Sequence, residues 1–386
     1  VMDVNSGDLL ALASNPSFEP NKFVTGISHG DYNGYLGDTY RPLHNKWASG
    51  MYPPGSTFKM VVALAALEAG VVGPRDTVFC NGGMKLGRRR FHCWRRGGHG
   101  HMDLTASLEQ SCDVYYYEVA KRTGIDRIAA MARRLGLGVG YELPNPALRT
   151  GLMPTRDWKQ AARGESWQVG DTLNSGIGQG FVLATPLQLA VMTARIATGR
   201  MIEPRLVRAR AGTPVPVGDV PDLGIDRRHL AMVRDGMDEV VNSRRGTARR
   251  SRIVDEAFRM AGKTGTSQVR NITAAERARG VFRNEDLPWE RRDHALFVGY
   301  APYEAPRYAV AVVVEHGGGG SKAAAPVARD VLMRAHYGAQ VPPEAYPPGQ
   351  RPAPPVTVPE PRPGGRPEDW ERREPGIGST EARIRT

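Results

Sequence analysis

A serine and a lysine, three residues apart, follow a rigid Pro-Pro-Gly turn in the first part of the chain. Ser56 comes directly after residues 53–55, and Lys59 follows it. The apolar run from Met60 to Gly70 predicts a helix that begins after this turn. Since residues three apart share a helical face, the Lys59 amine is expected beside the Ser56 hydroxyl. A serine needs such an adjacent base to act as a nucleophile, so the pair predicts acyl transfer through Ser56.

The alternative for Ser56 is purely structural. Serine is a preferred helix N-cap because its hydroxyl accepts a hydrogen bond from an amide two or three residues on. Lysine is scarce in this chain, however: only eight of its 52 Lys and Arg residues are lysine. A surface position that needs only positive charge would usually be arginine here, and lysine, unlike arginine, can lose its proton. The start of a helix also offers free amide groups where an oxyanion would form.

Two further polar motifs lie later in the chain. Residues 111–113 read Ser-Cys-Asp before an aromatic run, and residues 263–266 read Lys-Thr-Gly-Thr after a short apolar segment. With Ser56 and Lys59 they follow the chain order of the serine acyl-enzymes that recognise penicillin. Each motif is weak alone, but the three in this order are specific.

On these motifs, the chain resembles the transpeptidase domain of the class B penicillin-binding proteins over about residues 1–340. It is most similar to the elongation-type penicillin-binding protein 2 family, as a fragment that contains the transpeptidase domain. The resemblance implies an α+β fold of the penicillin-binding/serine β-lactamase type. This fold has an antiparallel five-stranded sheet flanked by helices and an all-helical subdomain.

The resemblance also implies an activity and roles for single residues. Ser56 would attack the D-Ala-D-Ala carbonyl of a peptidoglycan stem peptide, release D-alanine and pass the acyl group to an amine on a neighbouring strand during cell elongation. β-Lactams mimic this acyl donor and would inhibit the enzyme. Asp113 stands where much of the superfamily has asparagine; it would pair with a lysine or hold a substrate amide, unless it is only an N-cap. The implied catalytic residues are Ser56, Lys59, Ser111, Asp113 and Lys263, and the implied substrate-binding residues are Thr264, Gly265 and Thr266.

All three cysteines of the chain fall in one segment with a histidine. Cys80, Cys93, His99 and Cys112 are separated by gaps of twelve, five and twelve residues. Three thiolates and one imidazole form a closed structural zinc set, although the spacing is not that of a zinc finger. A disulfide with one cysteine left over, ordinary buried cysteines and a core His99 are the alternatives. His92 and His101 are other candidates for the fourth ligand, but residues 98–100 match the family best.

The composition limits the classes of partner. A formal charge of +12 and a pI near 9.8 would suit nucleic acid or an anionic membrane surface. The sequence has no aromatic-interleaved basic motif and no glycine-rich phosphate-binding motif, so neither nucleic acid nor an organic cofactor is expected. We therefore interpret the charge as suited to an anionic cell envelope.

The chain is expected to contain one domain and a tail. Residues 1–340 would form the transpeptidase domain, and residues 341–386, with twelve prolines, predict a disordered tail. The strand-like pattern at Val1 suggests that more chain precedes it. By resemblance, a membrane anchor would place the domain on the periplasmic face of the bacterial inner membrane. Stem peptides, β-lactams, a membrane glycosyltransferase and cell-shape scaffold proteins are the implied partners.

Two other functions share these motifs. One is a hydrolase, either a D,D-carboxypeptidase or a β-lactamase, which would pass the acyl group to water. The other is a β-lactam sensor, in which acylation is the signal. The length of the chain and residues 178–190, which resemble the family's loop beside the cleft, favour the transpeptidase.

Overall fold

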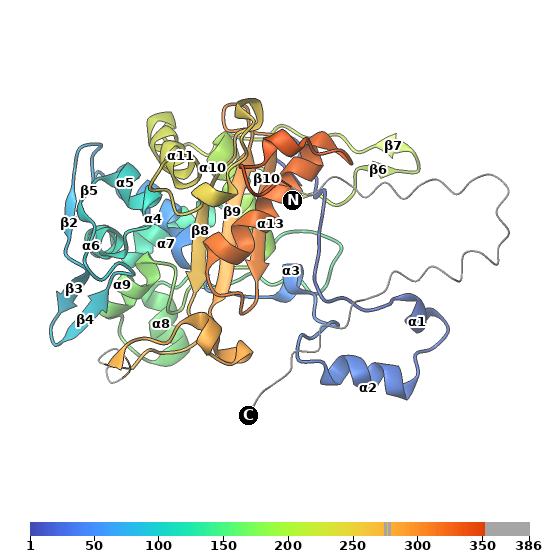
Figure 1. The fold of residues 1–386 in the computed structure, drawn as a ribbon, viewed down its shortest axis with the longest axis horizontal. Coiled ribbons are helices and arrows are strands. Elements are labelled where there is room, and N and C mark those ends of the chain that lie inside the picture. Colours follow the sequence, from blue (N-terminus) through green and yellow to red (C-terminus); the bar gives the residue numbers. More distant parts are fainter. Residues whose placement is uncertain (274–275, 277–278, 352–386) are drawn as a thin grey trace. The chain divides into compact units, whose positions relative to one another are not determined.

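A four-stranded antiparallel sheet lies between helices in the computed structural model, which describes residues 1–273, 276 and 279–351. The strands lie in the order β1-β10-β9-β8 (Figure 1). In β8 and β9, Lys263 is opposite Val298 and Thr266 is opposite Ala295. The bounds of the strands are Met2–Asp3 for β1, Ala261–Ser267 for β8, His294–Ala301 for β9 and Tyr308–Val314 for β10.

Helices cover both faces of this sheet because its strands alternate between two apolar cores. Leu296 and Val298 of β9 belong to the larger core, whereas Ala295 and Phe297 belong to a second core. α13 (Gly320–Tyr337) supplies Ala324, Ala325 and Leu332 to this second core. On the other face, α10 (Pro186–Thr198) packs against β9 and β10, and α11 (Arg227–Asn242) lies along β8.

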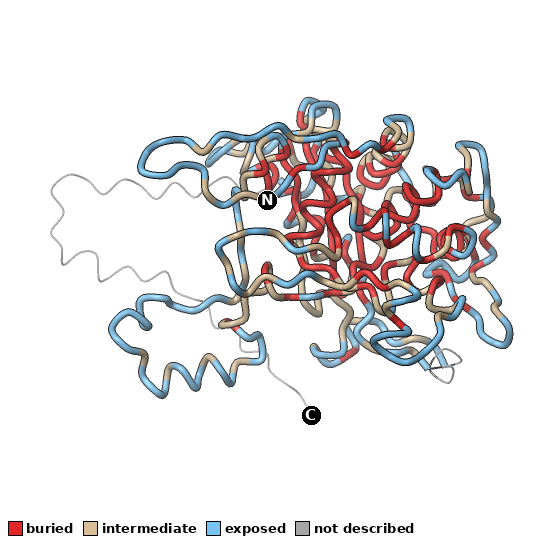
Figure 2. Tube along the Cα trace, turned by 180° about the vertical axis from the view of Figure 1, so that it is seen from behind, coloured by how far each residue is buried: buried red, intermediate tan, exposed pale blue. Residues whose placement is uncertain are grey.

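The rest of the larger core is helical. α4 (Lys59–Glu68) is almost completely buried and packs against α6 and α7. Figure 2 shows how the buried segments gather in the sheet and in these helices. The surrounding helices are α5 (Leu104–Glu109), α6 (Asp113–Thr123), α7 (Ile125–Arg134), α8 (Arg156–Arg163) and α9 (Val169–Gly176).

The chain also contains two-stranded sheets and short helices. The helices α1 and α2 contain no buried residue and lie in an exposed segment (Figure 2). The two-stranded sheets pair β2 (Val78–Cys80) with β5 (Gly100–Met102), β3 (Gly83–Leu86) with β4 (Arg89–His92), and β6 (Ala209–Arg210) with β7 (Thr213–Pro214). The short α-helices are α1 (Asn21–Val24), α2 (His29–Gly37) and α3 (Lys46–Ser49). The 3-10 helices are η1 (Gly55–Phe58), η2 (Arg249–Ser251), η3 (Glu256–Phe258), η4 (Asn284–Asp286), η5 (Trp289–Arg291) and η6 (Pro343–Ala345).

The predicted α+β architecture is present, with one difference in detail. Five strands were expected in the main sheet, and the described residues contribute four. The strand-like pattern at Val1 corresponds to β1, which pairs with β10 and also forms an antiparallel bridge from Met2 to Leu9.

The start of the predicted tail is part of the packed unit. Residues 341–350 belong to it: Ala345 is buried, and its carbonyl accepts a hydrogen bond from the Val254 amide. Residues 352–386, the rest of the predicted tail, lie outside the described residues. Among the described helices, none has both the length and the apolar character required to cross a bilayer.

The contact between α13 and the sheet can be tested at Gly320. A side chain at this position would overlap the carbonyl oxygens of Leu296 and Gly265. We expect Gly320→Ala to lower the free energy of unfolding by about 1–3 kcal/mol, because the helix must move away from the strands. The measurement is urea unfolding. Gly319→Ala is the matched control, since a Cβ at that position has no neighbour within 4 Å; equal effects of the two substitutions would contradict this packing.

Candidate active site and adjoining cysteine cluster

Ser56 lies in a tight turn held between two other segments. The turn η1 precedes α4, and Ser56 is half-buried within it. The Gly55 amide donates to the Gly178 carbonyl at 2.9 Å. Gly55 has φ +55°, and a side chain there would overlap the Thr266 carbonyl oxygen of β8. The glycine therefore lets the serine approach the strand that carries the third motif.

Lys59 is completely buried and makes its hydrogen bonds to the second motif. Its Nζ donates to the Ser111 carbonyl at 2.9 Å, the Ser111 Oγ at 3.2 Å and the Asp113 Oδ1 at 2.7 Å. Three oxygens thus match the three donors of an ammonium group. Ser111 has φ +53°, an unfavourable conformation for a residue with a side chain, so the surrounding contacts hold it in place.

Ser56 and Lys59 lie in the consecutive helices η1 and α4, as expected from their spacing. Within the described structure, however, no hydrogen bond joins their side chains. The physical reason is the carboxylate of Asp113, which is a stronger partner for the lysine than a hydroxyl. Catalytic hydrogen bonds are often long or misaligned before a substrate binds. The Lys59 amine is thus hydrogen-bonded to Ser111 and Asp113 rather than to Ser56.

Lys263 is the second fully buried lysine of the site. Burial lowers the pKa of Lys263 well below its ordinary value, and the nearby charge of Lys59 lowers this pKa further. Its Nζ donates to the Thr264 carbonyl at 3.2 Å. Along the same strand Thr266 is exposed, so β8 presents both a buried amine and an accessible hydroxyl.

Three residues outside the predicted set contact the predicted site. The Trp94 amide donates to Asp113 Oδ2 at 2.9 Å, and its indole N–H lies 3.1 Å from the Ser111 carbonyl. Gln179 Nε2 donates to the Thr266 carbonyl at 3.0 Å. The Thr247 hydroxyl lies 2.8 Å from the Thr264 hydroxyl. Gln179 belongs to residues 178–190, the segment expected beside the cleft, whereas no local pattern identifies Trp94 or Thr247, because each contacts a segment far away in the sequence.

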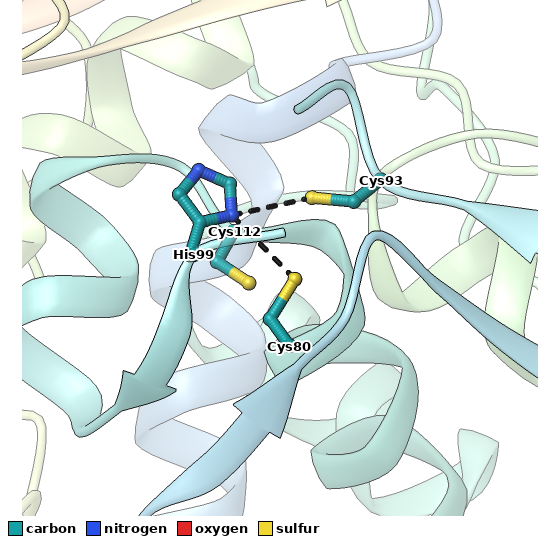
Figure 3. Close-up of side chains that lie close together, drawn as sticks. All are labelled: Cys80, Cys93, His99 and Cys112. Carbon is teal, nitrogen blue, oxygen red and sulfur yellow. Dashed lines mark hydrogen bonds between the residues drawn. The ribbon is translucent and has the colours of Figure 1, made fainter. Parts of the chain in front are cut away.

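The three cysteines and His99 meet next to this second motif. Figure 3 shows their sulfur atoms and the His99 ring turned toward one another. The four donor atoms lie within 4.8 Å of one another, and His99 Nδ1 is 3.6 Å from the Cys80 Sγ and 3.5 Å from the Cys93 Sγ. Cys112, the fourth member, separates Ser111 from Asp113.

The donor set fits a structural metal ion. All three cysteines are free and buried, and three sulfurs with one imidazole nitrogen suit tetrahedral zinc. The structure brings His99 to the sulfurs, whereas His92 and His101 are exposed. A closed set of four protein ligands leaves no position for a substrate, so such an ion would have a structural role.

Comparisons with known proteins agree with this arrangement. Residues 1–333 match the model of the penicillin binding protein transpeptidase domain. The chain is 38% identical to the peptidoglycan D,D-transpeptidase MrdA of Haemophilus influenzae over 340 residues, which cover 86% of this chain and 52% of that protein. The MrdA of Escherichia coli K12 is also 38% identical, with 83% and 51% covered. The chain thus spans about half the length of these curated relatives.

Solved structures confirm the predicted fold family. A crystal structure of Pseudomonas aeruginosa PBP2 in complex with WCK 5153 is 41% identical, with a TM-score of 0.76 over 87% of this chain and 69% of that chain. A complex of PBP2 and MreC from Helicobacter pylori is 34% identical, with a TM-score of 0.77 and 88% and 60% covered. A peptidoglycan synthase complex that coordinates polymerization and crosslinking also matches, at 34% identity and a TM-score of 0.72 over 88% and 55%.

The burial of Lys263 predicts a pH dependence of stability. The lowered pKa means that the unfolded chain binds more protons at this site than the folded chain, between the folded-state pKa and the ordinary 10.5. Stability rises with pH wherever the unfolded state binds more protons. The difference in the free energy of unfolding, wild type minus Lys263→Met, is therefore expected to increase as the pH rises toward 10.5 and to level off above it.

Urea unfolding at a series of pH values measures this difference. Lys322→Met is the matched control, because it removes a lysine whose side chain is 81% exposed. If the difference between wild type and Lys263→Met changes with pH no more than the difference between wild type and Lys322→Met, burial of the Lys263 amine does not affect stability as expected.

Proposed function

This chain belongs to the penicillin-binding protein transpeptidase family, and from that membership we propose that it is a serine D,D-transpeptidase that cross-links peptidoglycan stem peptides during cell elongation. The observation that carries the proposal is the buried amine of Lys59, which bonds to Ser111 and Asp113 one helical turn from Ser56. The names of the relatives, peptidoglycan D,D-transpeptidases, support the same reaction.

The first half of the reaction makes an acyl-enzyme. The Ser56 Oγ attacks the carbonyl carbon of the D-Ala-D-Ala bond while Lys59, as a neutral amine, accepts the hydroxyl proton. The amide groups of Ser56 and Thr266 stabilise the oxyanion. The proton then passes through the Ser111 hydroxyl to the amine of the leaving D-alanine. Breaking the peptide bond leaves the donor peptide as an ester on Ser56.

The second half regenerates the serine. An amine of a neighbouring strand attacks the ester, and its proton returns through the same groups to the Ser56 oxygen. Asp113 holds the Lys59 amine through Oδ1 and keeps it directed to the site. Lys263, Thr264, Gly265 and Thr266 lie on β8, where the lysine and the hydroxyl groups are suited to hold the terminal carboxylate of the donor. A β-lactam would acylate Ser56 in the same way, without a leaving group that departs.

The cysteine cluster adds a structural metal to this proposal. Cys80, Cys93, His99 and Cys112 would hold a zinc ion, which supplies a cross-link between the hairpin that contains Trp94 and the loop that contains Ser111. No step of the reaction passes through this ion. Its expected effect is to keep the Asp113 carboxylate within hydrogen-bonding distance of the Lys59 amine.

Localisation and partners are proposed on the same basis. The relatives act on peptidoglycan according to their names, so the periplasmic face of the inner membrane is the place where this domain would find its substrate. A relative from Helicobacter pylori was solved with MreC, and another match is a peptidoglycan synthase complex. We propose equivalent partners here: a cell-shape scaffold protein and a membrane glycosyltransferase.

The nucleophile can be tested by covalent labelling. Exposure to a penicillin, followed by intact mass measurement and peptide mapping, should place an adduct on Ser56 that lasts for hours. Ser56→Ala should reduce the labelling rate by roughly 10³-fold or more, because the nucleophile is gone. The exposed Ser17→Ala serves as the control. Labelling retained in Ser56→Ala would overturn the assignment, and an adduct that is lost within seconds would indicate a β-lactamase.

The metal can be tested by elemental analysis of protein purified without chelators. We expect about one zinc per chain, and chelation should lower the unfolding temperature because binding of the metal is coupled to folding. His99→Asn should lose the metal, whereas His101→Asn, at an exposed position two residues later, should keep it. A zinc-free wild type with a mapped disulfide would reject the site.

A further inference from the structure

A cluster of unpaired cations lies on the hairpin β3–β4 and the loop that follows it. We call this the cationic hairpin; its cations are Lys85, Arg88, Arg89, Arg90, Arg95 and Arg96. All six are exposed, and residues 77–102 contain no aspartate or glutamate. The reaction proposed above uses none of these side chains.

Ion pairing within the chain does not account for these charges. Within residues 1–273, 276 and 279–351, none of the six cations forms a salt bridge, although Arg134 pairs with Glu68 and Arg205 with Asp8 elsewhere. Arg89 has a different partner, the ring of Phe91, at 4.8 Å from its centroid. The remaining five cations therefore present their charge to the solvent.

The arrangement of the hairpin is unfavourable for stability in itself. Lys85 and Arg90 are directly opposite each other, and like charges at opposed positions destabilise a hairpin. The neighbouring pair, Met84 and Phe91, points to the other face, where Phe91 is buried against Tyr117. One face of the hairpin thus anchors it to the core, and the other gathers positive charge. An anion from outside the chain would relieve this repulsion.

The cationic hairpin adjoins the catalytic motif. Trp94 lies between Cys93 and Arg95, and 58% of it is exposed. Its amide donates to Asp113 and its indole N–H to the Ser111 carbonyl. A ligand on the cationic hairpin would therefore lie at the wall of the site that holds Lys59. The base of the hairpin lies at the four-residue cluster of Cys80, Cys93, His99 and Cys112, since Cys80 precedes β3 and Cys93 follows β4.

We propose that the cationic hairpin binds the carboxylates of the peptidoglycan strand and holds this polyanion beside Ser56. The inference rests on the proposed function, since a strand that carries many stem peptides presents one terminal carboxylate at each uncleaved stem. Arginine binds carboxylates through two parallel hydrogen bonds, and several arginines on one rigid hairpin contact several stems at once. The contiguity with Ser111 and Asp113 favours the substrate polymer over a lipid surface, because only a bound strand gains from lying next to the nucleophile.

Binding of soluble, un-cross-linked glycan–peptide strands tests the proposal. The hairpin variant Lys85→Gln/Arg88→Gln/Arg90→Gln/Arg95→Gln removes four cations and keeps Arg89, which packs on Phe91. We expect its dissociation constant to rise at least tenfold and the salt dependence of binding to become weaker. Strands with amidated carboxylates should bind wild type as weakly as native strands bind the variant. The control Arg208→Gln/Arg210→Gln removes two exposed arginines from the other hairpin, β6–β7, and should not change the affinity.

Acylation separates a failure of this inference from a failure of the proposed function. The rate of labelling by a small penicillin, the metal content and the unfolding temperature should be the same in the hairpin variant and in wild type. Normal labelling with unchanged strand affinity would overturn the inference alone. If the hairpin variant loses the binding of wild type to vesicles that contain anionic lipid but binds strands as wild type does, the inference is also overturned, and the cations are assigned to a membrane. A wild type that no penicillin labels would overturn both proposals.

Discussion

The buried amine of Lys59 is the constraint on which the rest of the site depends. The side chain is completely excluded from solvent, and a charge in such a place destabilises the fold by about 3–5 kcal/mol if its partner is removed. Ser111 and Asp113 supply the three oxygens that it needs, and both belong to the junction of α5 and α6 rather than to its own helix. The packing of α4 against α6 is therefore fixed by a polar requirement as well as by apolar contacts. The strained backbone of Ser111 is tolerated because it completes this set.

The two buried lysines of the site differ in their hydrogen-bond partners. Asp113 pairs with Lys59, while Lys263 has only the Thr264 carbonyl as a partner among the described groups. Burial and the charge of Lys59 lower the pKa of Lys263, so its neutral form is favoured when Lys59 is charged. Two like-charged lysines side by side would be unstable without this difference. Asp113 thus anchors one amine, and burial favours the neutral form of the other.

The sequence predicted the parts of this site that depend on residue type and local spacing. Ser56 and Lys59 share a turn and a helix, so their proximity follows from the chain itself, and the α+β class follows from three motifs in a known order. The choice of His99 over His92 and His101 depends on which of these side chains turns toward the cysteines, and the spacing does not determine this. Trp94 and Thr247 were not predicted, since each contacts residues far away in sequence, whereas Gln179 lies in the segment 178–190 that was expected beside the cleft. The pairing of β1 with β10 joins opposite ends of the chain and likewise does not follow from local spacing.

The cysteine cluster and Lys59 are parts of one structural unit. Cys112 lies between the two residues that hold Lys59, and Cys93 precedes the residue whose amide holds the second oxygen of Asp113. A displacement of the cluster would therefore move the two Ser111 oxygens that accept from Lys59 and the Asp113 carboxylate together. The cationic hairpin adjoins the same cluster, because Cys80 precedes β3 and Cys93 follows β4. The contacts that hold Lys59 therefore reach the base of this hairpin through Trp94 and Asp113.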